Sequence, residues 1–355
     1  MGKKHVRACS IEAPCKINLH LSIGERRSDG FHDLESLFLP LAFHDTLALE
    51  CGGEDGNCSL EMSWEAPPGG VPPVIPIEKN LVSRAVSLFR ERSGFKSGLF
   101  IRLDKRVPVG AGLGGGSSDA AFCLLALNSL AGDALSMEEL REMAAILGSD
   151  VPFFLNRGTD NSVCPSAAFV GGRGERVEPV KTPRGLWVLL VKPDFSSDTA
   201  GAFQLLDQMR ETISREGVLS AREKPPADVL IKALEEEPET WPFYNDFLPV
   251  FLNSHNPQEL TTSPNGTFGA LHGGRRKQTL ELTGAKKAEQ YRTILANLKK
   301  AGASFSGLSG AGSCCFGIFK VRRTAEKAEK ELRIPGNFVK LTFFLAQKTI
   351  PVLEY

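Results

Sequence analysis

The sequence lacks net charge and long hydrophobic runs. Its 42 lysine and arginine residues balance 42 aspartate and glutamate residues, so no global field attracts nucleic acid or an anionic membrane. No apolar run approaches the roughly 18 residues that a membrane-spanning helix needs. The basic start, Met1 to Ser10, is not followed by the apolar segment of a signal peptide. We therefore expect a cytoplasmic protein that binds a small molecule, without nucleic acid or membrane partners.

Metal-type cysteine spacing is absent as well. The eight cysteines are scattered, with no Cys-x-x-Cys pair and no histidine at ligand spacing. Cys123 lies within an apolar run, where a free cysteine packs as a small hydrophobic side chain. We expect reduced, buried thiols and no metal site built by the chain itself.

The most informative segment runs from Pro108 to Ala121, a glycine-rich turn that leads into an apolar helix. Gly98 to Leu103 alternates like a strand, and Ala120 to Leu130 predicts the helix. Glycine lets backbone N–H groups approach a ligand, and the first turn of a helix presents unpaired N–H groups to the same point. The segment therefore predicts a phosphate-binding loop. Ser117 and Ser118 either cap the helix or contact phosphate or Mg²⁺, and capping is the expected role for one of them.

Two familiar phosphate motifs fit this loop only in part. The spacing Gly110-x-Gly112-x-x-Gly115 matches the dinucleotide pattern, but a second helix follows where that pattern needs a strand ending in an acidic residue. The loop also resembles a P-loop, yet Gly116 stands where the P-loop has its lysine. A cation for the phosphates must therefore come from elsewhere in the chain.

The stretch Pro-x-Gly-x-Gly-Leu-Gly-Gly-Gly-Ser-Ser-Asp-Ala-Ala is similar to the second motif of the GHMP small-molecule kinases. Ala301 to Phe316, another glycine-rich turn, resembles the third motif, which closes over the first loop. Within this superfamily the chain is most similar to the branch that uses ATP to phosphorylate the 2-hydroxyl of 4-diphosphocytidyl-2-C-methyl-D-erythritol, a cytidyl diphosphate sugar alcohol of the non-mevalonate isoprenoid pathway.

The resemblance implies an α+β, two-domain GHMP kinase fold. The N-terminal domain, over residues 1–184, is expected to be ribosomal-protein-S5-domain-2-like and to hold the ATP-binding glycine loop. The C-terminal domain, over residues 185–355, is expected to be ferredoxin-like. The expected assembly is a monomer or a weak homodimer.

The resemblance also implies the catalytic residues. Ala13 to Leu21 alternates strictly, and its polar positions are Lys16, Asn18 and His20. Alternation alone favours a solvated strand face. Pro-x-Lys-x-Asn-Leu, however, resembles the first motif, which implies that Lys16 lies beside the reacting hydroxyl and the γ-phosphate and that Asn18 binds substrate. Gly-x-Asp-Val-Pro resembles the segment that carries the catalytic aspartate, so Asp150 is the expected general base; a helix cap is the alternative.

Substrate recognition is expected at Asp29 to His32. Asp-Gly-Phe-His resembles the family's Asp-Gly-Tyr-His, which implies that His32 hydrogen-bonds the cytosine and that the ring of Phe31 stacks on it without the tyrosine hydroxyl. Taken alone, the segment is a surface loop with an exposed histidine. Thr199, in a turn before a helix, resembles a residue of the substrate-side loop.

ATP and Mg²⁺ are the implied cofactors. The resemblance places Asn80 and Lys105 beside the adenine ring, and the alternatives are a helix cap and a surface lysine. The loop residues implied in nucleotide binding are Pro108, Val109, Gly110, Ala111, Gly112, Leu113, Gly114, Gly115, Gly116, Ser117 and Ser118.

Some segments depart from a simple match. Leu34 to Glu50 predicts two strands joined by a turn at Phe43 to Asp45. The loop at 156–168 is longer than in the family, and Thr261 to Leu282 is expected to be an insertion. Three rival functions remain: another kinase of the superfamily, such as a homoserine or mevalonate kinase; a non-catalytic sensor with the same fold; and a dinucleotide oxidoreductase.

Overall fold

The computed structural model describes residues 8–52, 54, 56–65, 75–156, 165–215, 224–253 and 284–345, with the side chain of Arg215 left out. The expected insertion at 261–282 lies outside the described residues, as does most of the longer loop at 156–168. Within the described ranges, no helix combines the length and the apolar character that crossing a membrane requires.

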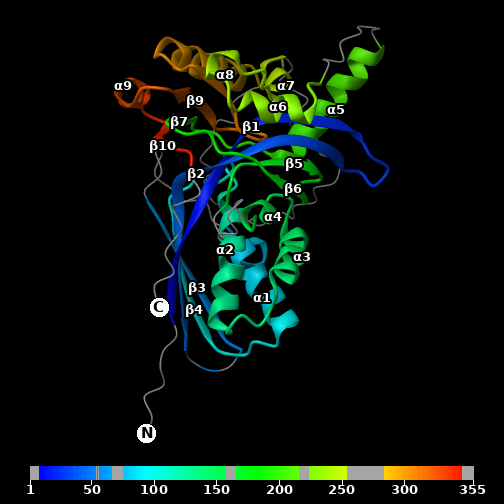
Figure 1. Cartoon of the computed structure of the whole chain (residues 1–355), viewed down its shortest axis with the longest axis vertical. Coiled ribbons are helices and arrows are strands. Elements are labelled where there is room, and N and C mark those ends of the chain that lie inside the picture. The colour runs from blue at the N-terminus through cyan, green and yellow to red at the C-terminus, as the bar shows by residue number, and fades with distance from the viewer. Residues whose placement is uncertain are drawn as a thin grey trace, which may run out of the picture.

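The first sheet comes from the N-terminal half of the chain (Figure 1). Its six strands are β1 (Ala8–Arg26), β2 (His32–Cys51), β3 (Cys58–Trp64), β4 (Leu99–Lys105), β5 (Ala168–Gly172) and β6 (Arg176–Pro179). β1 and β2 form a long antiparallel hairpin, and β2 also pairs with β4 and β5. β3 runs parallel to β4 at one edge, and β6 pairs with β5 at the other.

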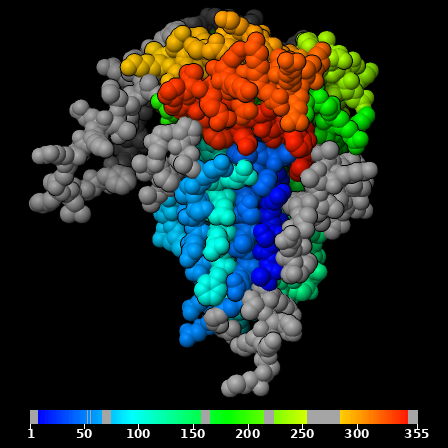
Figure 2. Space-filling view, turned by 90° about the vertical axis from the view of Figure 1, so that its left-hand side faces the viewer, coloured from blue at the N-terminus to red at the C-terminus, as the bar shows by residue number. Residues whose placement is uncertain are grey.

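Helices cover one face of this sheet (Figure 1). They are α1 (Leu81–Ser93), α2 (Gly115–Leu130), α3 (Met137–Leu147), the short α4 (Val151–Phe154) and the single 3₁₀ turn at Ile77–Lys79. Leu47 and Leu49 of β2 alternate toward this layer, as do Ile101 and Leu103 of β4. α2 is buried nearly all round because it lies between the sheet and the other helices. On the opposite face, part of the sheet is exposed at the surface (Figure 2), including Phe100 of β4, while residues of β1 and β2 pack against the second sheet.

The second sheet comes from the C-terminal half. Its antiparallel strands are β7 (Trp187–Lys192), β8 (Phe305–Leu308), β9 (Cys315–Phe319) and β10 (Phe338–Phe343), in the order β10-β7-β9-β8. The accompanying helices are α5 (Thr199–Arg215), α6 (Ala227–Ala233), α7 (Phe247–Asn253), α8 (Gly284–Lys300) and α9 (Arg322–Leu332), with a 3₁₀ turn at Pro238–Thr240.

Strand β7 is buried on both of its faces. Leu189 and Val191 pack in one cluster with residues of α5, α8 and α9. Val188 and Leu190 pack in another cluster that also contains residues of β1 and β2. The apolar core is therefore continuous between the two sheets, and the α+β class is confirmed. The expected division between residues 184 and 185 falls between β6 and β7 and stays a prediction.

The turn predicted at Phe43 to Asp45 is wrong, because β2 passes through these residues without interruption. The adjacent polar residues His44 and Asp45 favour a turn when only their neighbours in the sequence are considered. In the fold, the Asp45 carboxylate is fully buried and finds its partners on β4 and the loop that follows it. A polar residue inside a strand is tolerated when the neighbouring strand satisfies its hydrogen bonds.

Candidate active site

The glycine-rich loop joins β4 to α2, as expected, but the helix begins earlier than predicted, at Gly115. Gly114 is the N-cap residue and, having no side chain, makes no side-chain cap hydrogen bond. The expectation that one of the two serines caps the helix is therefore wrong, since Ser117 and Ser118 both lie within its first turn. The first turn keeps its unpaired N–H groups, which are the groups that bind an anion at a helix N-terminus.

Three glycines of the loop adopt left-handed backbone conformations, with φ of 65° at Gly110, 72° at Gly112 and 68° at Gly114. Packing also excludes a side chain at Gly112 and leaves little room for one at Gly114. A Cβ on Gly112 would lie 2.0 Å from the carbonyl oxygen of Ser309, and one on Gly114 would lie 3.0 Å from Cε of Lys16. Glycine is therefore required at these positions by close packing against other segments as well as by the backbone conformation.

The second glycine-rich turn closes on the first. The Ser309 hydroxyl donates to the Gly112 carbonyl at 2.8 Å, and the backbone N–H of Cys314 donates to the carbonyl of Ala111 at 3.1 Å. This confirms the closure expected for Ala301 to Phe316. The same segment contains the hairpin loop that joins β8 to β9.

Lys16 and Asp150 meet beside the glycine loop. The Lys16 ammonium lies 3.2 Å from the Asp150 carboxylate and donates to Oδ1 of Asn18 at 2.5 Å. Lys16 and Asn18 are 2% and 3% exposed, so the solvated strand face that alternation favoured is wrong. Asp150 stands at the N-cap of α4 but makes no side-chain cap hydrogen bond, and its side chain is 30% exposed. Its carboxylate is thus free of the capping role and open to a ligand.

Lys16 also supplies the positive charge that a P-loop lysine would provide and that the glycine loop itself lacks. Its backbone N–H donates to the carbonyl of Leu113 at 2.9 Å, and its side chain packs under Gly114. The ammonium therefore comes from β1 to a position beside the first turn of α2. Asn18 fixes this arrangement, because its Nδ2 donates to the Ser36 hydroxyl and its backbone N–H donates to the Ser309 hydroxyl. Contact between Asn18 and a substrate stays a prediction.

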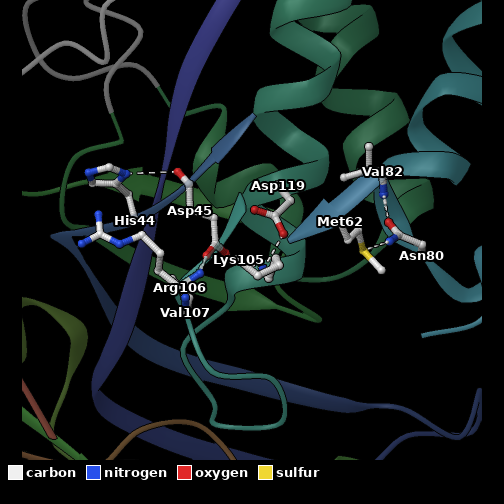
Figure 3. A network of polar contacts seen from close by, with 9 residues as sticks. All are labelled: His44, Asp45, Met62, Asn80, Val82, Lys105, Arg106, Val107 and Asp119. Atoms are coloured by element: carbon white, nitrogen blue, oxygen red, sulfur yellow. Dashed lines mark hydrogen bonds and ion pairs between the residues drawn. The ribbon is translucent and has the colours of Figure 1, made fainter. Parts of the chain in front are cut away.

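A buried network of charges lies behind the loop (Figure 3). The Lys105 ammonium, 3% exposed, donates to the carboxylates of both Asp45 and Asp119. The second oxygen of Asp45 accepts the backbone N–H groups of Arg106, at 2.5 Å, and Val107, at 2.8 Å. Lys105 is therefore not a surface lysine, and Asp45 fixes the chain where β4 passes into the glycine loop.

Two polar atoms at the start of α2 have no hydrogen-bond partner among the described residues. They are Oδ1 of Asp119 and the hydroxyl of Ser118, and both are buried. Burial raises the pKa of Asp119 to about 7; the Lys105 ammonium opposes this rise, and the Asp45 carboxylate adds to it. Unsatisfied buried oxygens are costly, and their position suits a site that a ligand completes.

A cavity of about 360 Å³ opens between the glycine loop, β4 and the start of α1. Asn80, Lys105 and Asp119 line it, together with the loop residues Pro108 to Ser117. Asn80 is the N-cap of α1, where its Oδ1 accepts the N–H of Val82 at 2.9 Å. The capping alternative is confirmed, while contact with adenine stays a prediction for both Asn80 and Lys105.

The residues expected to bind the cytosine ring, Phe31 and His32, lie at the far end of the β1–β2 hairpin. Phe31 is 51% exposed, with the Arg173 guanidinium 4.9 Å from its ring centroid. His32 is 7% exposed, so the exposed histidine of the loop interpretation is wrong. Its Nε2 lies 2.9 Å from Oδ1 of Asp207, and its ring stacks on Phe203. Both partners lie on α5, and Asp207 is 175 residues from His32 in the chain, so no local sequence pattern indicates them.

Thr199 is the first residue of α5 and is exposed. The neighbouring Asp198 caps this helix by accepting the N–H groups of Ala200 and Gly201. A substrate contact of Thr199 stays a prediction. After α2 the chain forms α3 rather than a strand, as expected, which argues against a dinucleotide fold.

Two family models match the chain, one described as the GHMP kinases N terminal domain over residues 80–158 and one described as GHMP kinases C terminal over residues 266–337. A 4-diphosphocytidyl-2-C-methyl-D-erythritol kinase of Thermodesulfovibrio yellowstonii is 33% identical over 90% of this chain and 92% of its own length. The kinase of the same name from Treponema pallidum subsp. pallidum is 31% identical over 92% of this chain and 95% of its own length.

Solved structures share the fold. The crystal structure of a 4-(cytidine 5'-diphospho)-2C-methyl-D-erythritol kinase superposes with a TM-score of 0.64 at 27% identity, covering 94% of this chain and 98% of that one. A homoserine kinase from Cytophaga hutchinsonii superposes with a TM-score of 0.58 at 16% identity, covering 100% and 99% of the two chains. The second likeness concerns the fold alone.

Proposed function

Because this chain belongs to the 4-diphosphocytidyl-2-C-methyl-D-erythritol kinase family of the GHMP kinases, we propose that its site phosphorylates the 2-hydroxyl of 4-diphosphocytidyl-2-C-methyl-D-erythritol. The products are the 2-phosphate and ADP. The observation that carries the proposal is the pair formed by Lys16 and Asp150, 3.2 Å apart, beside a glycine loop that opens a helix. A non-catalytic sensor of this fold would need neither residue.

The nucleotide occupies the glycine loop and the cavity next to it. The loop offers backbone N–H groups and the N-terminus of α2 to the phosphates, while the cavity of about 360 Å³ takes the base. The contacts between the two glycine-rich turns hold the loop in one conformation before ATP arrives. Such preorganisation lowers the cost of ordering the site during the reaction.

Phosphoryl transfer asks the protein mainly for positioning and charge stabilisation. A bond forms between the substrate 2-oxygen and the γ-phosphorus, while the bond from that phosphorus to the bridging oxygen of ADP breaks. Asp150 accepts the proton of the hydroxyl, and the Lys16 ammonium stabilises the negative charge on the transferred oxygens. Asn18 and Phe38 hold Lys16 in place, by a hydrogen bond and by a ring 4.4 Å from the ammonium.

The residues fit Mg²⁺ as a companion of the nucleotide. Mg²⁺ prefers oxygen ligands and is usually held by one or two carboxylates together with substrate phosphates. Ser118 supplies a buried hydroxyl that has no hydrogen-bond partner among the described residues, and the phosphates of the nucleotide supply further oxygens. Within those residues, no three His, Cys, Asp or Glu side chains gather as a metal site. When bound, the ion would neutralise phosphate charge, and Ser117 and Ser118 are the residues that would hold it together with the phosphates.

Substrate recognition is proposed at the distal end of the hairpin. Phe31 offers an exposed aromatic face on which cytosine stacks, and His32 offers a ring nitrogen to the base. Thr199 lies at the start of α5, and Asn18 lies on β1. We propose that both residues contact the sugar alcohol diphosphate. We further propose that the protein is cytoplasmic and is a monomer or weak homodimer, and light scattering tests the assembly. The proposed domains are residues 1–184 and 185–355, and limited proteolysis tests this boundary.

The deciding experiment measures ADP release from Mg-ATP with 4-diphosphocytidyl-2-C-methyl-D-erythritol, homoserine or mevalonate as acceptor. Turnover with the cytidyl acceptor alone supports the proposal, and ADP only with another alcohol rejects it. Asp150→Asn should lower kcat by about 10²–10⁴-fold, because the hydroxyl loses its base. Asp228→Asn removes an exposed carboxylate of α6 and serves as the matched control. Full kcat in Asp150→Asn would reject the general-base assignment.

A further inference from the structure

His32 is held by two side chains that lie one turn apart on α5. The ring of Phe203 stacks on the imidazole with centroids 5.0 Å apart and an interplanar angle of 23°. The carboxylate of Asp207 lies 2.9 Å from Nε2. Residues four apart on a helix share one face, so a single rigid element fixes both contacts. The stack sets the plane of the imidazole, and the hydrogen bond sets its orientation within that plane.

The partner of Nε2 also decides which nitrogen carries the proton. An ionised carboxylate accepts hydrogen bonds and donates none, so Nε2 must be the donor. In the neutral imidazole the other nitrogen, Nδ1, then has a lone pair and accepts. The His32 side chain is 5% exposed and that of Asp207 is 26% exposed, so the pair is sheltered but still connected to the solvent.

We propose that Asp207 is a positioning residue that fixes the Nε2–H tautomer of His32 and so makes the site select a pyrimidine with an exocyclic amino group. The proposal rests on the proposed function, in which His32 contacts the base. An accepting Nδ1 pairs with the 4-amino group of cytosine, which donates. The same nitrogen meets the 4-carbonyl oxygen of uracil as a second acceptor, which leaves two lone pairs facing each other.

The alternative is that Asp207 merely ties α5 to the hairpin. A purely structural tie would affect folding, and it would leave the choice between cytosine and uracil unchanged. The two roles therefore separate in substrate specificity and in the tautomer of His32, which stability measurements alone do not report.

The test compares Asp207→Asn with the unchanged enzyme on the cytidyl substrate and on its uridyl counterpart, 4-diphosphouridyl-2-C-methyl-D-erythritol. The asparagine amide can turn its NH₂ group toward Nε2, which then accepts and moves the proton to Nδ1. We expect KM for the cytidyl substrate to rise by about 3- to 10-fold with kcat within about twofold, because one hydrogen bond to the base is lost. The preference for cytidyl over uridyl substrate should fall by about tenfold or more.

Two further variants control this comparison. Asp207→Glu keeps a carboxylate and should retain most of the cytidyl preference. Asp33 lies next to His32 in the sequence, and its side chain is 57% exposed and pairs with Arg27. Asp33→Asn removes this carboxylate and should leave the preference for the cytidyl substrate unchanged. If Asp33→Asn lowers the preference as much as Asp207→Asn does, loss of charge rather than the hydrogen bond is responsible, and the proposal fails.

Nitrogen-15 NMR of the unliganded protein tests the tautomer without any activity. In the unchanged chain, His32 should carry its proton on Nε2, and a proton on Nδ1 in the neutral ring overturns the proposal even if Asp207→Asn does not fold. An unchanged enzyme that fails to use the cytidyl substrate rejects the proposed function instead. An enzyme that works, with an Asp207→Asn variant of undiminished cytidyl preference, rejects only the role of Asp207.

Discussion

The hydroxyl of Ser309 donates to the carbonyl oxygen of Gly112 at 2.8 Å, and this hydrogen bond joins two glycine-rich turns from opposite halves of the chain. The same hydroxyl accepts the backbone N–H of Asn18 at 3.2 Å. A single buried side chain thus connects the phosphate loop, the strand of Lys16 and the loop between β8 and β9. The catalytic geometry depends on contacts between the two sheets as well as within each.

Ser309→Ala should therefore lower both stability and activity. The change leaves the N–H of Asn18 and the carbonyl of Gly112 without that partner in a buried place, which costs about 1–3 kcal/mol of unfolding free energy. Urea denaturation measures this loss. Ser304→Ala is the matched control, because its hydroxyl only contacts Glu239 at the surface, and we expect a change within about 0.5 kcal/mol. Equal effects of the two changes would contradict the linking role of Ser309.

Gly112→Ala tests the close approach of the two turns. An added Cβ would lie 2.0 Å from the Ser309 carbonyl oxygen, in a residue whose φ is +72°. We expect a loss of at least about 2 kcal/mol in unfolding free energy and weaker ATP binding, measured by calorimetry. For stability, Gly116→Ala is the control, since its Cβ would meet only Leu81, at 3.9 Å, within a helix that alanine favours. A stable Gly112→Ala variant with normal ATP affinity would show that the turns separate freely.

Lys16→Met tests the cation that reaches the loop from β1. The methionine keeps much of the packing against Gly114 but removes the positive charge, so kcat should fall by about 10²–10³-fold. Unfolding free energy should fall by about 1–3 kcal/mol, because Oδ1 of Asn18 loses its donor. Lys181→Met removes a lysine that is 80% exposed and should leave ADP release unchanged. Retention of more than half of kcat in Lys16→Met would exclude a charge-stabilising role.

Asp119→Asn tests the protonation of the buried network. Burial raises the pKa of this carboxyl from 3.8 to about 7, so between these values the folded chain holds a proton that the unfolded chain releases. The contribution of Asp119 to stability is therefore present at low pH and lost as pH rises toward 7. The unfolding free energy of Asp119→Asn, relative to that of the unchanged protein, should increase as pH rises from 3.8 to about 7. Above this range the difference should stay constant. Urea titrations without nucleotide, from pH 4 to pH 8, measure the difference; a gap that does not change with pH would place the pKa of Asp119 near its ordinary value.

Several local features were predictable because their causes are local. The glycine loop, its position between a strand and a helix, and the capping box that begins α3 at Ser136 all depend on residues within a few positions of one another. The α+β class and the closure of the second turn followed from motifs that resemble a known superfamily. Asn80 capped its helix as the local alternative predicted.

Other predictions failed where distant partners decide the outcome. The turn expected at Asp45 is a continuous strand, because Lys105 and the N–H groups of Arg106 and Val107 satisfy the carboxylate. Neither loop serine caps α2, because the left-handed Gly114 already forms the start of the helix. His32 is buried, because Phe203 and Asp207 of α5 cover it.

The sequence by itself determined which residue types stand where: a glycine-rich turn before an apolar helix, a lysine on an alternating strand and an aspartate before Val-Pro. Those features reflect backbone conformation and short-range hydrogen bonding, which act between near neighbours. Only the tertiary structure decided that Lys16 faces Asp150, that Ser309 reaches Gly112 and that Asp207 pairs with His32. Burial of charged and polar groups requires that each finds a partner, and in this protein the partners come from segments that are distant in the sequence.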